Sequence, residues 1–124
     1  MIEAATKQDL NMWMSGIQAT GDISNADSCF ELKSRSAIRY HNFIEVFGLN
    51  PQQAPRIIEK ANGLLDSVKE FGMSGSIIPH TPYSVTNELF QAILDVNSIG
   101  NAPWSIHHME SLAESELVQS GTGK

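Results

Sequence analysis

Apolar residues recur along most of the chain at intervals of three and four positions, the spacing that places side chains on one face of an α-helix. In the segment 6–19 these residues are Leu10, Trp13, Met14 and Ile17. The same spacing predicts further helices over 29–47 and 55–71, a fourth helix that begins at 81–82 or at 84 and is stopped by Gly100, and a last helix that begins near 101–103. Asn50 followed by Pro51 is a typical helix start and supports a short turn before the third helix.

Helices of this length are marginal in isolation, so their apolar faces must pack against one another. We therefore expect an all-α fold, a compact bundle of about five short amphipathic helices. The length of 124 residues predicts a single domain, which we place at 1–119, with a flexible tail at 120–124. The longest non-helical stretch is 72–83, which is rich in glycine, serine and proline.

The composition restricts the class of protein. Cys29 is the only cysteine, which excludes an internal disulfide and a site with several thiolates. No apolar run approaches the roughly 20 residues that cross a bilayer, and the first residues do not have the pattern of a secretory signal. We expect a cytoplasmic protein without a membrane partner. The formal net charge of −6 favours a partner with a basic surface over nucleic acid.

A local excess of basic residues between 33 and 60 suggests nucleic-acid binding as an alternative. Two helices around Gly48 have the pattern of a helix-turn-helix, in which the second helix enters the major groove of DNA. A DNA-binding regulator would use residues 35–60 and would contact DNA through Arg35, Arg39, Gln52, Gln53, Arg56 and Lys60. Pro55 and the net charge oppose this function.

The candidates for a metal site are few. His107, Glu110 and Glu114 would share one face of the last predicted helix, a spacing that can hold a metal when other helices add ligands. No second pair with such spacing occurs in the sequence, so we predict no metal and no cofactor. An enzyme site assembled from His80, His107, Glu110 or Tyr83 remains the third hypothesis.

The segment 72–83 is the predicted interaction site. Long loops in compact domains are often functional, and exposed apolar residues mark protein interfaces. The predicted partner-binding residues are Met73, Ile77, Ile78, His80 and Tyr83. The alternative is that Ile77 and Ile78 fold back onto the core. Our leading hypothesis is a non-enzymatic adaptor, inhibitor or regulatory subunit that docks on another protein, and spare apolar helix faces leave a homodimer open.

Overall fold

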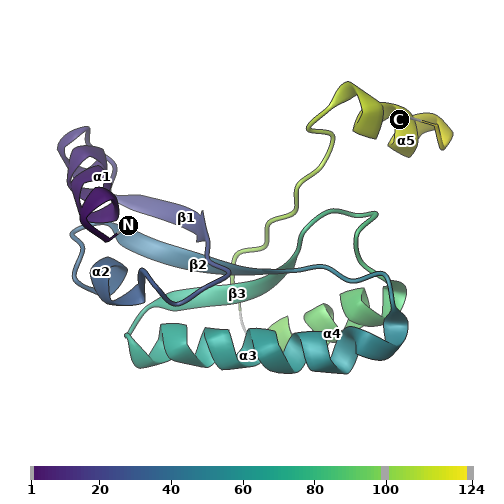
Figure 1. The fold of residues 1–124 in the computed structure, drawn as a ribbon, viewed down its shortest axis with the longest axis horizontal. Helices are drawn as coiled ribbons and strands as arrows, with labels where there is room; N and C mark the ends of the chain where they lie inside the picture. The colour runs from purple at the N-terminus through teal and green to yellow at the C-terminus, as the bar shows by residue number, and fades with distance from the viewer. Residues whose placement is uncertain (1, 99–100, 123–124) are drawn as a thin grey trace.

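The computed structural model describes residues 2–98 and 101–122. Helices and strands alternate along the chain (Figure 1). In order they are α1 (Ile2–Met14), β1 (Ala19–Ile23), α2 (Phe30–Ser34), β2 (Arg39–Val46), the 3-10 helix η1 (Pro51–Gln53), α3 (Ala54–Glu70), β3 (Ser74–Pro79), α4 (Asn87–Asn97) and α5 (Leu112–Ser120).

The three strands form one parallel sheet in the order β1-β2-β3. Parallel neighbours need a crossover connection, and α2 and α3 lie in the two crossovers of this sheet. The prediction of an all-α bundle is therefore wrong, because the fold is α/β. The predicted bounds of one domain at 1–119 and a tail at 120–124 stay a prediction; α5 includes Ser120, and residues 123–124 lie outside the described residues.

The predicted helix over 29–47 is a short helix followed by a strand. Helix α2 ends at Ser34, and β2 begins at Arg39. In β2 the fully covered positions alternate, as Asn42, Ile44 and Val46. The buried Asn42 interrupts the apolar alternation by which a strand is recognised, because its side chain makes hydrogen bonds rather than apolar contacts.

The predicted loop 72–83 contains β3. Ile77 and Ile78 are both 0% exposed. Ile77 packs in the hydrophobic core, whereas Ile78 is buried on the opposite face of the same strand. Glycine is required at position 75 of this strand, because a Cβ there would clash with the backbone oxygen of Asn42 at 2.8 Å. Buried parallel strands are short apolar runs without alternation, and here glycine and serine shorten that run further.

The hydrophobic core lies between the sheet and helices α3 and α4, which both lie below the sheet in Figure 1. The helical periodicity of α3 is confirmed, with Ile58, Ala61, Leu65 and Val68 buried along one face. The predicted start at Asn50 is also confirmed, because its side chain accepts a hydrogen bond from the backbone N–H of Gln52.

The segments at the two ends of the described chain contribute few buried side chains. Helix α1 has no buried residue. The predicted fifth helix is wrong over 101–111, where the chain forms no helix and turns at Met109 before α5 begins at Leu112. This segment rises past the sheet toward α5 (Figure 1). Among the described residues, no helix is both long enough and apolar enough to cross a membrane.

Candidate functional site

Two side chains meet where neighbouring parallel strands end. Glu45 is the next-to-last residue of β2, and His80 directly follows β3. The backbone N–H of His80 donates to the carbonyl of Val46, so the strand pairing continues to this point. Because side chains alternate along a strand, Glu45 lies on the face opposite the helix-covered Ile44 and Val46. The carboxyl ends of parallel strands are where α/β folds place their ligands.

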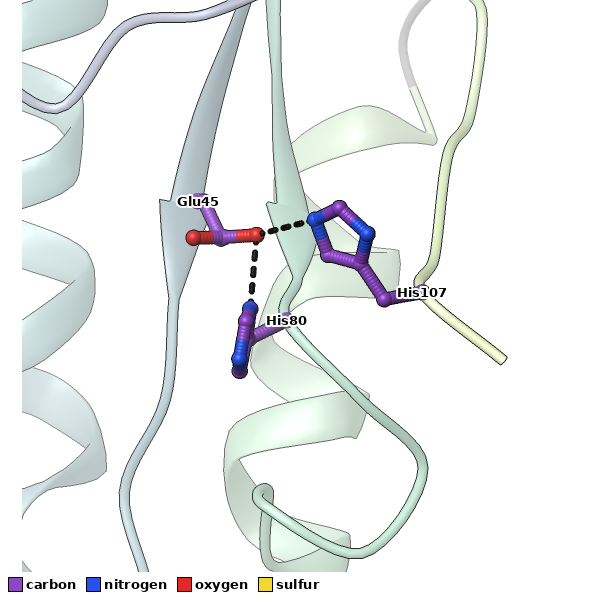
Figure 2. A group of neighbouring side chains, drawn as sticks. All are labelled: Glu45, His80 and His107. Atoms are coloured by element: carbon purple, nitrogen blue, oxygen red, sulfur yellow. Dashed lines mark hydrogen bonds and ion pairs between the residues drawn. The ribbon is translucent and has the colours of Figure 1, made fainter. Parts of the chain in front are cut away.

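A third side chain comes from the segment 101–111, between α4 and α5. The backbone N–H of His107 donates to the carbonyl of His80 at 2.9 Å, and the Ser76 hydroxyl donates to the carbonyl of Pro103 at 2.7 Å. These two contacts hold the segment against β3. His107 thereby reaches Glu45 from a distant part of the sequence, as Figure 2 shows.

The three side chains converge on one carboxylate oxygen. Glu45 Oε1 lies 2.8 Å from Nδ1 of His80 and 3.0 Å from Nε2 of His107. All three potential ligand atoms lie within 4.8 Å of one another. The other ring nitrogen of His107, Nδ1, lies 2.8 Å from Glu110 Oε1.

The surroundings of Glu45 favour its ionised form. Burial of the side chain raises the pKa of Glu45. Hydrogen bonds from His80 and Asn25, together with the charges of His80 and His107, lower this pKa by more than burial raises it. The pKa of Glu45 therefore lies below its ordinary value. For His107, the hydrogen bond to Glu110 raises the pKa above its ordinary value, against a smaller opposing effect of desolvation. A carboxylate beside two imidazoles can bind a cation or exchange protons.

The donor set fits a zinc-class divalent cation. Two imidazole nitrogens and one carboxylate oxygen are the protein ligands of one common type of catalytic zinc site, which keeps a fourth position open. Metal-binding histidines usually donate their other N–H to a carboxylate, as His107 does with Glu110. Tetrahedral ligands of zinc lie about 3.4 Å apart. Glu45 Oε1 would need to move only about half an ångström away from each of the two histidine nitrogens to reach that spacing.

The metal candidates of the sequence analysis come together only in part. His107 contacts Glu110, but the carboxylate of Glu114 accepts hydrogen bonds from backbone N–H groups of Met109 and Glu110 instead. Glu45 is absent from the site residues predicted above. Its signal in the sequence is an acidic residue between the apolar positions of a strand, which is visible only once 39–46 is known to be a strand.

The predicted partner-binding residues do not form one exposed surface. Ile77 and Ile78 have no exposed area for a partner, and Met73 is partly buried against the core. His80 faces Glu45, and Tyr83 is 49% exposed. The alternative in which Ile77 and Ile78 fold back agrees with their burial, although they do so as part of a strand.

The helix-turn-helix hypothesis is also wrong, because residues 39–46 form β2 rather than the first helix of that motif. Two of the six predicted DNA contacts lie outside a helix, since Arg35 caps α2 and Arg39 begins β2. The other four are exposed on η1 and α3: Gln52, Gln53, Arg56 and Lys60. Arg35 is also paired with Glu31 at 2.7 Å.

The sequence matches no protein-family model and no curated protein. Among solved structures, it matches the Helicobacter pylori aminofutalosine deaminase, solved in complex with methylthio-coformycin, with a TM-score of 0.82 at 22% identity. The match covers 98% of this chain and 30% of the deaminase chain. The chain has the fold of part of a deaminase.

This similarity corrects the functional hypothesis. The expectation of a non-enzymatic adaptor, inhibitor or regulatory subunit rested on a helical bundle without a catalytic constellation. The fold is instead one that an enzyme has, and three potential metal ligands meet at its strand ends. The chain spans less than a third of the deaminase it matches, so the match shows a shared fold and not the activity of the whole enzyme.

Proposed function

We propose that this chain carries the metal-binding part of a hydrolytic, deaminase-type active site, with Glu45, His80 and His107 as protein ligands of a zinc-class cation. The observation that carries the proposal is the convergence of two imidazoles and one carboxylate within 4.8 Å at the strand ends. The similarity to the aminofutalosine deaminase supports it, because that protein is named for the hydrolytic removal of an amino group.

The chain's own residues define the roles in such a site. Glu45 brings the negative charge, and its depressed pKa keeps that charge available. His80 and His107 bring imidazole nitrogens, and Glu110 accepts a hydrogen bond from Nδ1–H of His107, which leaves Nε2 to face the cation. A zinc-class ion with three protein ligands supplies a Lewis acid and an activated water for hydrolysis.

The proposal is tested by titrating zinc into the chelator-treated protein and measuring the binding by calorimetry. The visible spectrum of bound Co²⁺, used in place of zinc, reports the ligand geometry. We expect one ion per chain. The His107→Ala variant should lower the affinity by at least about 10-fold, because loss of an outer contact alone has effects of that size. The matched control is His108→Ala, since His108 is the exposed neighbour of His107 and is not one of the three candidate ligands.

Two results would contradict the metal site: no zinc bound by the unmodified protein, or equal affinities for the His107→Ala and His108→Ala variants. The reaction class has a separate test, in which the zinc-loaded protein is incubated with aminofutalosine and ammonia release is measured. Zinc binding without ammonia release would limit the proposal to the metal site.

A further inference from the structure

Glu114 occupies an unusual place in the structure. It is 7% exposed, although it lies in the first turn of a helix whose other described residues are partly or fully exposed. The apolar side chains of α5 do not anchor the helix, since Leu112 is 78% exposed and Leu117 and Val118 are exposed too. The buried contact of α5 is therefore made by a carboxylate.

Both oxygens of this carboxylate bind backbone groups that precede the helix. Glu114 Oε1 accepts from the N–H of Met109 and Oε2 from the N–H of Glu110, each at 2.8 Å. In return, the hydroxyl of Ser111 accepts from the N–H of Glu114 at 3.1 Å. The arrangement resembles a capping box, but the carboxylate reaches beyond the cap residue to the two residues before it.

The residues held by Glu114 form a tight turn. Met109 has a φ of 56°, the left-handed conformation that is unfavourable for a residue with a Cβ. Such a conformation persists where its surroundings determine it, and here the hydrogen bond from the Met109 N–H to Glu114 is that constraint. The turn brings the side chain of Glu110 back onto Nδ1 of His107 at 2.8 Å.

We infer that Glu114 is a positioning residue for the Glu45–His80–His107 cluster. By fixing the turn at Met109 and Glu110, it places Glu110 against His107, and this contact orients Nε2 of His107 toward Glu45. The carboxylate of Glu114 binds the backbone N–H groups of Met109 and Glu110 rather than a side chain of the cluster, so its effect on the cluster is indirect. The consequence for metal affinity rests on the proposed function, whereas the orientation of His107 does not.

The test compares Glu114→Ala and Glu114→Gln with two controls. Glu116→Gln changes an exposed glutamate of the same helix. Ser111→Ala removes the other half of the cap but keeps the two hydrogen bonds that Glu114 accepts. If Glu114 only stabilised α5, then Ser111→Ala would reproduce the effect of Glu114→Ala. Circular dichroism checks that each variant keeps its fold. If Glu114→Ala unfolds, Glu114→Gln serves in its place, because the amide retains one acceptor oxygen.

The first measurement is the ¹⁵N spectrum of the His107 ring in the metal-free protein, together with amide exchange at Met109 and Glu110. In Glu114→Ala we expect the His107 ring signals to shift and both amides to exchange faster, with a smaller change in Glu114→Gln and none in the two controls. Unchanged ring signals in Glu114→Ala, or equal changes in Ser111→Ala, would overturn the positioning role.

The second measurement is zinc affinity, which we expect to fall by about 10-fold in Glu114→Ala, the lower end of the range for contacts outside the ligand sphere. Zinc affinity that stays unchanged while the ring signals shift would overturn the inference that the turn matters for the metal. If the unmodified protein binds no zinc but Glu114→Ala still shifts the ring signals, the proposed function fails and the positioning role of Glu114 stands.

Discussion

Replacement of Ile77 distinguishes a core strand from an exposed loop. Ile77 is 0% exposed, lies in β3 and belongs to the same core cluster as Ile44, its partner in the sheet. Ile77→Ala removes three buried carbon atoms, which corresponds to about 2.4 kcal/mol of transfer free energy at about 0.8 kcal/mol each. The cavity that remains raises the expected loss in the free energy of unfolding to about 3–4 kcal/mol. Ile77→Val, which removes one carbon, should cost about 1 kcal/mol.

The matched control is Tyr83→Ala, because Tyr83 follows the same strand but is half exposed. We expect this variant to lose less than about 1 kcal/mol, as is usual for surface positions. Urea unfolding followed by circular dichroism gives the free energy of unfolding for each variant. If Ile77→Ala and Tyr83→Ala lost similar amounts, the packing of β3 against α3 and α4 would be refuted.

Two further predictions concern the face of the sheet near α2 and the middle of β2. Lys33 is buried and donates to three polar side chains, so Lys33→Met should lower the free energy of unfolding by about 2 kcal/mol. This loss is smaller than for a fully buried ion pair, because the partner Asp22 is 44% exposed. The control Lys69→Met breaks an exposed ion pair and should cost less than about 1 kcal/mol in the same urea assay. Burial lowers the pKa of His41, so the unfolded chain binds more protons than the native state below about pH 6.5, and stability should fall as the pH decreases through that value. His41→Asn should remove this part of the pH dependence in urea unfolding between pH 7 and 5.5, and an unchanged slope would show that the burial of His41 does not contribute.

The helices with local signals were predictable from the sequence. Helix α3 has an apolar face of regular spacing, and Asn50 caps the turn before it. Helix α4 lies within the predicted fourth helix but begins later than either predicted start, because its cap is Thr86, whose hydroxyl accepts from the N–H of Leu89. These features depend on residues within a few positions of one another, so the sequence pattern contains them.

The strands were not predictable in the same way, because their burial depends on distant residues. Asn42 is buried through contacts with Lys33 and Ser24, and Gly75 is required by the backbone of the neighbouring strand. A buried asparagine and a glycine in short strands weaken the alternation that identifies them. Consequently the pattern over 29–47 and 72–83 favoured a helix and a loop.

The candidate site depends on the same missing information. His80 and His107 were each considered in the sequence, but they are separated by 26 intervening residues and have no motif in common. Their convergence with Glu45 requires that β2 and β3 run parallel, so that both strands end at the same edge. An all-α fold has no such edge, and the error in fold class therefore removed the site as well.

The alternation of side chains across the sheet separates the hydrophobic core from the candidate metal site. Ile44 and Ile77 face the helices and belong to the core, whereas Glu45 and its register partner Ile78 lie on the opposite face, toward the segment that carries His107. A substitution such as Glu45→Gln should therefore change metal affinity without the large loss of unfolding free energy expected for Ile77→Ala. A protein in which both substitutions unfolded the chain equally would place Glu45 among the structural residues, and the cluster at the strand ends would then serve to hold the segment 101–111 rather than a cation.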